Sequence, residues 1–597
     1  MSSHRPADAR RAPLALLVLA ALAAAGLWFV HDRYLVLVAT QVLVWATLGL
    51  AWNIVGGYAG QLSFGHAAFF GIGAFGVALT YAHWQLTPWL GIPLVAVLGA
   101  LAALVVGAIT FRLRGHYFSL AMLAYPMALL YVFEWGGFQE VSLPMRRDDG
   151  WVAMQFDDPR WLGLVALALA VFTAYVSIAI ERSAFGLRLA AIKEDESAAR
   201  AAGVAVFRSK LAAMVASGAF AAAAGGLYAV VLLLVTPAAV FGMFTSAQAL
   251  IVCLFGGVGT VWGPLIGAVV LMPTSEFLTA QFGATLPGIQ GVLYGVAIIA
   301  IVLVAPEGIY WRVVDALGRS RRPMPAREAP PAVVAIPVRP RRADGPTKQA
   351  SLMQVRGLSR AFGGVAAVEG FDIDVLPGTV HGLIGPNGAG KTTAFNLING
   401  FVRPQAGVVT FDGADVTGRT PEDLCRRGIG RTFQTVRAFR RLSVRQNVMV
   451  AALTTAPRLA AAHALADAAL EVVGLSPAEA DVAAGSLTSL QLRLMELARA
   501  LAGRPKLLML DETLAGLGRD DLPAIVGAIR RIADTGVTVL IIEHTMHVLA
   551  NITDTLTVLD HGRVIAQGRP TEVLDDPRVI ESYLGKKWAD RALRQVA

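Results

Sequence analysis

Long apolar runs with very few charges fill the first half of the chain. Residues 211–275 contain no Asp, Glu, Lys or Arg, and neither do residues 35–64. Runs of about 20 apolar residues have the length of a helix that crosses a bilayer, and these are too many for one soluble core. We therefore expect a polytopic α-helical membrane domain of about 8–10 transmembrane helices, some of them broken. The candidate spans are residues 13–30, 35–55, 67–83, 90–111, 117–135, 161–180, 211–235, 245–274 and 288–305.

The second half of the chain is polar, and a phosphate-binding loop follows one of its apolar strands. The loop residues are Gly385, Pro386, Asn387, Gly388, Ala389, Gly390, Lys391, Thr392 and Thr393. In the pattern G-x-x-x-x-G-K-[ST], backbone N–H groups wrap the phosphates, Lys391 reaches the β and γ oxygens, and the Thr392 hydroxyl ligates Mg²⁺. A strand at Val380–Ile384 and a helix at Thr393–Ile398 fit this pattern, so we predict a membrane-coupled NTPase.

Two carboxylates end another apolar strand, about 120 residues after the loop. The run Leu507–Leu510 leads directly into Asp511 and Glu512. One carboxylate of such a pair holds Mg²⁺ through water, while the next orients or deprotonates the attacking water. We assign Asp511 to the metal and Glu512 to the base. A further strand, Val537–Ile542, ends close to His544, which could sense the γ-phosphate.

Basic residues indicate which loops face the cytoplasm. The loops 112–116 and 181–210 fall on the same side as the arginine-rich N-terminus, as the positive-inside rule requires. The N-terminal apolar run also resembles a signal peptide, but the many spans after it favour an uncleaved first helix. The nucleotide-binding half must lie in the cytoplasm, whereas residues 236–240 are expected outside. The run 245–274 should therefore break into two short helices.

Glycines mark where apolar runs are interrupted. Gly256–Gly259, together with Gly263 and Pro264, should break the run 245–274, and Gly56–Gly60 interrupts the first half similarly. Paired interruptions of this kind point to the translocation path of a transporter, although close helix packing through small residues would also explain them. His66 and Glu134 are ionisable residues near predicted span ends, where we expect them to lie at the membrane interface.

Composition separates the chain into three parts. We expect a permease domain at 1–317, a Pro/Arg-rich cytoplasmic linker at 318–350 and an ATP-binding domain at 351–597. The net charge of +9 lies largely in the linker and in segments that flank the membrane, which favours contact with anionic membrane lipid. No interleaved aromatic and basic pattern suggests nucleic acid. Cys253 and Cys425 lie in different halves of the chain, so we expect no disulfide between them. This expectation fits a reducing cytosol.

The order of these motifs resembles the nucleotide-binding domain of ABC transporters. Between the phosphate loop and the carboxylate strand lie Arg431-Thr432-Phe433-Gln434 and Leu487-Thr488-Ser489-Leu490-Gln491. Residues 362–364 and the tail 568–585 are similar to the ATPase of branched-chain amino acid importers. Residues 57–71, 185–196 and 254–268 resemble the permease of the same system. The resemblance covers nearly all of the chain except the linker.

The resemblance implies a set of cofactors and roles. ATP and Mg²⁺ are the expected cofactors, Gln434 would touch the metal while facing the permease, and Phe362 would stack on adenine. Glu512, His544 and Gln434 form the expected catalytic set, and 487–491 the signature loop that meets the ATP of an opposing subunit. A coupling helix is expected around Ala191–Ala202, docking beside Gln434. The expected coupling-loop residues are Glu194, Asp195, Glu196 and Gly203.

The resemblance also implies an assembly. A permease fused to its ATPase would need a second permease and a second ATPase subunit, or a homodimer, together with an external solute-binding protein. It would import branched-chain or related amino acids across the bacterial inner membrane. Urea, short amides or aromatic carboxylates are alternative cargoes, since the outer-loop pattern of the family survives only at 148–150. An exporter half-transporter is disfavoured, because the long cytoplasmic helix extensions of exporters are missing from the sequence pattern.

Three residues depart from the ATPase pattern of the family. Leu490 replaces the glycine of the signature loop, Thr513 replaces a proline after the carboxylate pair, and Gly518 stands where Asn or Asp is usual. A glycine lets backbone donors approach a phosphate closely, and the side chain of Leu490 would crowd that approach. A degenerate ABC protein that binds ATP but hydrolyses it poorly is therefore a second hypothesis.

Overall fold

The computed structural model describes residues 6–113, 115–146, 149–286, 288–316, 350–543 and 546–584. The chain forms two compact units. The helical unit comprises Ser2–Lys193 and Phe207–Ala326. The α/β unit comprises Arg327–Ala597 and, from the middle of the first half of the chain, the segment Glu194–Val206. This short segment lies between helices of the helical unit in sequence, but it is part of the α/β unit in the fold.

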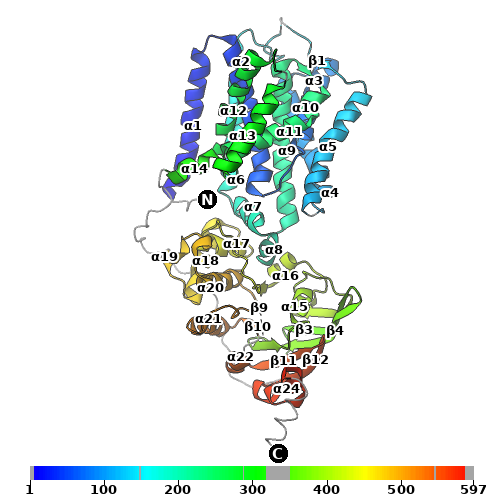
Figure 1. Ribbon diagram of the computed structural model, residues 1–597, viewed down its shortest axis with the longest axis vertical. Coiled ribbons are helices and arrows are strands. Elements are labelled where there is room, and N and C mark those ends of the chain that lie inside the picture. The colour runs from blue at the N-terminus through cyan, green and yellow to red at the C-terminus, as the bar shows by residue number, and fades with distance from the viewer. Residues whose placement is uncertain are drawn as a thin grey trace, which may run out of the picture. The chain divides into compact units, whose positions relative to one another are not determined.

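Long and short helices build the helical unit (Figure 1). They are α1 (Pro6–Phe29), α2 (Arg33–Asn53), η1 (Ile54–Tyr58), α3 (His66–Trp84), α4 (Pro88–Thr110), α5 (His116–Trp135), α6 (Arg160–Glu181), α7 (Ala184–Glu194), α9 (Val206–Leu232), α10 (Pro237–Phe241), α11 (Met243–Gly256), α12 (Trp262–Phe282), α13 (Ile289–Val304) and α14 (Ile309–Ala316). A short antiparallel pair joins β1 (Val141–Ser142) and β2 (Leu234–Val235). Within the described residues, 10 segments are long and apolar enough to cross a membrane, so the predicted polytopic fold is confirmed.

The helices differ in how much of their surface is buried. Helix α2 packs against α6, α11 and α12, and every residue from Val44 to Asn53 is buried. Helices α4, α5 and α13 instead expose many large apolar side chains, among them Leu101, Tyr131 and Leu303. Apolar side chains that face outward suit a hydrocarbon environment, so these helices have the surface expected next to lipid.

Both predicted interruptions are present. Helix α11 ends at Gly256 and α12 begins at Trp262, so the run 245–274 forms two helices. The number of membrane crossings expected from the sequence predicts this break. A Cβ on Gly256 would lie 1.7 Å from the carbonyl oxygen of Gly263, which means that only glycine allows this close crossing. Gly263 itself lies in the first turn of α12 and not in the break. In the first half, α2 passes into the π-helix η1, which contains Gly56 and Gly57.

His66 is not placed as expected. It begins α3, but its side chain is fully buried in the helical unit and does not face a membrane interface. Its Nε2 lies 2.7 Å from the Ser217 hydroxyl, which donates to the Ala51 carbonyl, and its Nδ1 lies 3.1 Å from the Ser63 hydroxyl. Because Ser217 gives its proton to Ala51, it accepts from Nε2–H, and Nδ1 accepts from Ser63. Glu134 is exposed near the end of α5.

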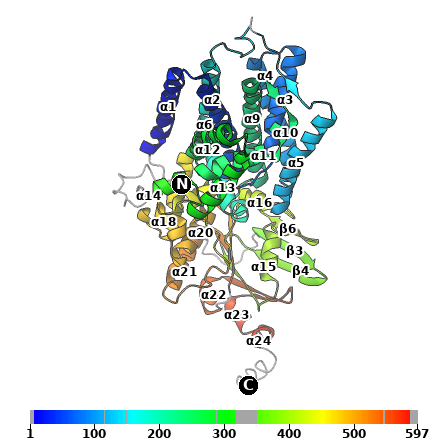
Figure 2. The ribbon, with the colours of Figure 1, turned by 45° about the horizontal axis from the view of Figure 1, so that its top comes forward.

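Two sheets form the framework of the α/β unit. The larger has the order β12-β11-β5-β10-β9-β8, in which only β12 is antiparallel to its neighbour. Its strands are β5 (Val380–Ile384), β8 (Ile429–Arg431), β9 (Leu507–Asp511), β10 (Thr538–Ile542), β11 (Thr555–Asp560) and β12 (Arg563–Gly568). The smaller, antiparallel sheet has the order β4-β3-β6-β7, with β3 (Met353–Phe362), β4 (Val365–Val375), β6 (Ala406–Phe411) and β7 (Ala414–Asp415). Figure 2 shows β3, β4 and β6 side by side, near helix α15.

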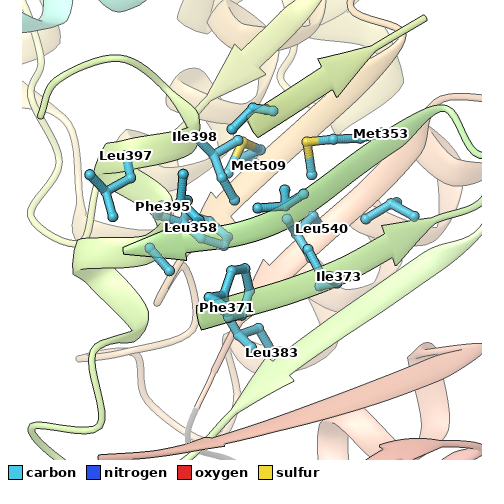
Figure 3. Packing of buried hydrophobic residues seen from close by; sticks show 14 of the residues in the cluster. Met353, Leu358, Phe371, Ile373, Leu383, Phe395, Leu397, Ile398, Met509 and Leu540 are labelled. Atoms are coloured by element: carbon cyan, nitrogen blue, oxygen red, sulfur yellow. The ribbon is translucent and has the colours of Figure 1, made fainter. Parts of the chain in front are cut away.

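Helices complete the α/β unit. They are α8 (Glu196–Ala201), α15 (Lys391–Ile398), α16 (Pro421–Arg427), α17 (Val444–Ala452), α18 (Leu459–Val473), α19 (Pro477–Ala480), α20 (Ser489–Ala502), α21 (Leu522–Asp534), α22 (Met546–Ile552), α23 (Pro570–Leu574) and α24 (Pro577–Leu584), with a 3₁₀ turn η2 (Ala484–Ser486). The core between the two sheets and α15 is apolar, and Figure 3 shows Phe371, Leu383 and Phe395 packed within it.

The central strands explain where the site forms. All five residues of β5, β9 and β10 are buried, as expected for parallel strands covered on both faces. Because these strands run in the same direction, the residues that follow them gather at one edge of the sheet. The phosphate-binding loop, Glu512 and Glu543 all lie at this edge.

Candidate nucleotide site

The phosphate-binding loop connects β5 to α15. Helix α15 begins at Lys391, two residues before the predicted start. Gly388 and Gly390 have φ of +84° and +100°, and a Cβ on Gly390 would lie 2.2 Å from the Ala367 carbonyl. These backbone conformations require glycine. A loop that ends in a helix N-terminus presents N–H groups to an anion, so the geometry suits a phosphate.

Lys391 lies across this loop. Its Nζ donates to the carbonyls of Gly385 at 2.7 Å and Pro386 at 2.9 Å. Burial lowers the pKa of Lys391, and the nearby carboxylates of Glu512 and Asp511 act in the opposite direction. The ammonium is thus held at the carbonyls of the loop, within electrostatic reach of the predicted base Glu512 and the predicted metal ligand Asp511. Thr392 and Thr393 follow it in the first turn of α15.

Asp511 is the last residue of β9 and is 1% exposed. Its Oδ2 pairs with Nη2 of Arg431 at 3.1 Å. Burial raises the pKa of Asp511, while the Arg431 guanidinium lowers it. Its buried Oδ1 has no hydrogen-bond partner among the residues that the structure describes. An orphaned carboxylate oxygen suits a hard cation such as Mg²⁺, so the donor set fits the metal that the sequence implies.

Glu512 has an unusual backbone and a specific partner. Its φ is +47°, in the left-handed region that residues with a side chain seldom adopt. Its carboxylate Oε2 accepts a hydrogen bond from Nε2 of Gln434 at 2.6 Å. The next turn is fixed by Glu543, which is buried and accepts from the backbone N–H of Leu514 at 2.6 Å. The structure therefore brings together the predicted base and Gln434, which the family resemblance places in the glutamine loop at the metal; the two residues lie 78 positions apart.

Helix α20 holds the segment around Gln434 through buried charged side chains. These residues were not identified from the sequence. Arg493 donates to the carbonyls of Phe433 at 2.9 Å and Gln434 at 2.7 Å, and Arg499 donates to the carbonyl of Arg437 at 2.7 Å. Glu496 lies between these arginines, is 1% exposed, and accepts from the N–H of Phe433 at 3.3 Å. Arg493, Glu496 and Arg499 follow one another at intervals of three residues in a largely apolar helix, and this spacing could have identified the cluster from sequence.

The signature-loop segment forms the start of α20. Thr488 is the N-cap, and its hydroxyl accepts from the N–H of Gln491 in a capping box. The Gln491 amide also donates to Glu479 at 2.7 Å. Leu487 and Leu490 are half-buried, while Thr488 and Ser489 are exposed. Leu490 thus occupies the first turn, where helix N–H groups would otherwise face a phosphate directly.

The predicted coupling-loop residues lie against the ATP-binding half within the α/β unit. The helix expected around Ala191–Ala202 is divided in two, since residues 191–194 end α7 and α8 begins at Glu196, with Asp195 as its N-cap. Arg437 pairs with Asp195 at 3.1 Å, and Arg441 with Glu194 at 3.8 Å. Because Arg437 follows Gln434 by three residues, this segment lies directly beside the glutamine loop.

Gly203 fits closely against the same surface. Its φ is +80°, and a Cβ there would lie 2.3 Å from Cγ2 of Thr454. Its carbonyl accepts from Arg426 of α16 at 3.3 Å. Both the backbone conformation and the lack of space require glycine at this position.

Two further site residues have different outcomes. Phe362 ends β3, is 46% exposed, and has the Arg360 guanidinium 5.0 Å from its ring centroid. An exposed aromatic ring is available for stacking. His544 lies outside the described residues.

Comparison with known proteins follows the same division of the chain. Residues 34–302 match the family model of the permease component of the branched-chain amino acid transport system. Residues 368–515 match the ABC transporter model, and residues 563–589 match the model of the branched-chain amino acid ATP-binding cassette transporter. The high-affinity branched-chain amino acid transport ATP-binding protein BraF of Pseudomonas aeruginosa is 39% identical in an alignment of 253 residues that covers 39% of this chain and 98% of that protein. The chain belongs to the branched-chain amino acid ABC transporter family.

Two further proteins are similar to the same half of the chain. LivG of Escherichia coli, a high-affinity branched-chain amino acid transport ATP-binding protein, is 36% identical over 39% of this chain and 98% of its own length. A solved nucleotide-free ATP-binding cassette from an ABC transporter is 32% identical, with a TM-score of 0.37, and covers 40% of this chain and 100% of its own. By its family matches, this chain joins an ABC permease to an ABC-type ATPase, and its hydrolysis of ATP is coupled to transport.

Proposed function

We propose that this chain is a fused permease and ATPase subunit that imports branched-chain or related amino acids across the bacterial inner membrane. The observation that carries the proposal is the agreement between its two halves. The permease segment 34–302 and the ATPase segment 368–515 match different families, yet the permease model and the ATPase relatives name one transport system. Urea, short amides and aromatic carboxylates are the alternative cargoes.

The geometry supports specific roles at the ATP site. Backbone N–H groups of 385–393 and the ammonium of Lys391 would bind the phosphates, and Phe362 would stack on adenine. Thr392, Asp511 and Gln434 would hold Mg²⁺, which when bound would neutralise charge on the phosphates. Glu512 would take the proton of the attacking water. Since Gln434 donates to Glu512 here, moving this amide toward the metal would release the carboxylate for that task.

One chain supplies one permease and one ATPase. A working transporter would therefore need a second copy of each, from other subunits or from another copy of this chain, and an external solute-binding protein. ATP would be bound between the phosphate-binding loop of one ATPase and the signature loop of the other. The N-terminal segment and the ATPase would both face the cytoplasm.

The test is uptake of radiolabelled leucine into cells that lack their own branched-chain transporters. Cells that express this chain with its partner subunits and binding protein should accumulate leucine, and the same cells with Lys391→Ala should not. Labelled urea and benzoate provide the alternative cargoes in parallel assays. Accumulation of either one, with no leucine uptake, would reject the amino-acid assignment but not the import mechanism. Export of preloaded leucine would reject import itself.

A slow ATPase is a second candidate function, and Leu490 is the observation that favours it. The first turn of α20 carries this branched side chain where the family has glycine. The rate of ATP hydrolysis by the purified complex separates the two functions, because a regulatory site would bind ATP without turnover.

A further inference from the structure

The two interrupted segments of the helical unit meet each other. Asn53, the last residue of α2, donates through Nδ2 to the Thr260 carbonyl at 3.1 Å and accepts from the N–H of Gly259 at 2.9 Å. A Cβ on Gly57 would lie 2.9 Å from the Gly259 nitrogen, so the two backbones touch. Interruptions that are about 200 residues apart in sequence therefore form one irregular junction, which we call the break junction (residues 53–60 and 257–261).

Lys193 reaches into this junction from helix α7. Its ammonium donates to the Gly57 carbonyl at 2.8 Å and lies 3.3 Å from the Cβ position of Gly259. Its stem packs on Gly60, where a Cβ would lie 2.8 Å from Cγ of Lys193. Backbone groups freed by a broken helix need partners, and a charged donor at a carbonyl is a strong one. Lys193 therefore bonds to one side of the break junction and leaves no free space for a side chain at Gly259 on the other.

The residues that follow Lys193 are held by the ATPase. Glu194 is the next residue, and Asp195 pairs with Arg437 at 3.1 Å. Arg437 is three residues from Gln434, whose amide donates to Glu512. A side chain at the break junction and one held beside the ATP site are thus two residues apart on one backbone. A displacement of Asp195 cannot be absorbed by a long flexible segment before it reaches Lys193.

We propose that Lys193 is the positioning residue that transmits the state of the ATP site to the break junction. The proposal rests on the proposed transport function, because it supplies the link between ATP binding and the predicted translocation path. When Gln434 moves with bound nucleotide, Arg437 and Asp195 move with it. The Lys193 ammonium then shifts at the Gly57 carbonyl, and the junction rearranges. An element with two arrangements that both sites bias is the physical requirement for such coupling.

The experiment measures the accessibility of the break junction in the assembled complex. Cys253 and Cys425 are replaced by alanine, and Thr260→Cys provides the only thiol of this chain. The rate of N-ethylmaleimide labelling is measured with and without the ATP analogue AMPPNP and Mg²⁺. We expect the analogue to change the rate by about 2- to 30-fold, the range of typical coupling energies. Lys193→Arg should retain this change, whereas Lys193→Met should remove it while analogue binding stays unaltered.

Controls separate coupling from folding and from the proposed function. Arg208→Met, which alters an exposed cation in the first turn of α9, should leave the response intact. If Lys193→Met fails to assemble, Lys193→Gln replaces it, since its shorter amide falls short of the Gly57 carbonyl. Lys391→Ala should abolish the response by abolishing analogue binding. A wild-type response in Lys193→Met or Lys193→Gln would overturn the proposal, as would no response in the unsubstituted complex. Failure of leucine uptake with the labelling response intact would reject only the cargo.

Discussion

At the scale of single residues, the predicted base of the ATP site is already engaged in a hydrogen bond with another side chain. Glu512 accepts a hydrogen bond from Gln434, and its positive φ is maintained by the buried turn after β9. A left-handed backbone at a non-glycine residue costs free energy, and such residues cluster at functional sites. The strain and the occupied carboxylate agree with a catalytic role for Glu512.

Glu512→Gln should bind ATP with an affinity close to that of the unsubstituted protein. Its hydrolysis rate should fall by about 10²–10⁴-fold, because the phosphate and metal contacts remain while the attacking water loses its base. Nucleotide binding and phosphate release, measured on the same preparation, give both numbers. Lys391→Ala is the matched control, since it should weaken binding itself. Turnover of Glu512→Gln within about twofold of normal would show that another residue is the base.

We expect burial of His381 to make the α/β unit less stable in acid. It is buried in β5 and lies 2.8 Å from the Thr557 hydroxyl, and burial lowers its pKa to about 4. In the unfolded chain, the imidazole of His381 binds a proton below a pH of about 6.5. Stability should therefore be full above that pH and should decrease by about 3 kcal/mol as the pH falls to about 4. Urea unfolding of the fragment from residue 351 onward measures this slope, and His381→Gln should reduce it.

At the scale of elements, three helices control the segment around Gln434. Helix α20 holds its carbonyls through Arg493 and Arg499, while α8 and α16 bring the coupling segment against it. The exposed ion pair between Arg437 and Asp195 contributes only about 0–1 kcal/mol by itself. The close fit of Gly203 and the cap of α8 must therefore define the docking geometry more than charge does.

Gly203→Ala should uncouple ATP hydrolysis from transport. The added methyl group would lie 2.3 Å from Cγ2 of Thr454, and the φ of +80° disfavours any side chain. We expect fewer leucine molecules transported per ATP, with ATP binding unchanged. A second change, Thr454→Ser, removes the clashing methyl group and keeps the hydroxyl. It should restore part of the coupling, since only the backbone strain remains. A normal ratio in Gly203→Ala alone would show that this contact does not control docking.

At the scale of the whole molecule, the chain joins one permease segment to one ATPase segment, and the ATPase segment has one predicted signature loop. In the proposed ABC dimer that loop would meet the ATP of the partner, while Lys391 and Glu512 would act on the ATP of this chain. A partner with an intact signature would make the two ATP sites unequal. Two copies of this chain would instead place Leu490 at both sites, and both should be slow.

Leu490→Gly tests this asymmetry in the assembled complex. Restoring close approach of the donors should raise the rate at the affected site by up to about 10²–10³-fold, the effect of one donor set on a developing charge. In a complex with a different ATPase, replacing the catalytic glutamate of each subunit in turn should give unequal losses. The larger loss should come from Glu512. Equal losses, or no gain from Leu490→Gly, would contradict the asymmetric arrangement.

The sequence by itself predicted most elements of this protein and the residues proposed for its chemistry. Uncharged apolar runs predicted the membrane helices, because a bilayer imposes length and polarity on each span separately. The glycines at 256–259 predicted the break between α11 and α12. The phosphate-binding loop and the strand that ends in Asp511 were identifiable because parallel β strands and phosphate cradles need fixed residue types at fixed spacing.

Only the tertiary structure decided which residues meet. The bonds of Gln434 to Glu512, Asn53 to Gly259, and Lys193 to Gly57 join positions far apart in sequence. Such contacts depend on where folding places whole elements, and no local period encodes them. His66 shows the same limit, because its position at a span end suggested an interface, while the packing of α3 against Ser217 buried it completely. Sequence specifies the parts through local physics, and packing alone connects them.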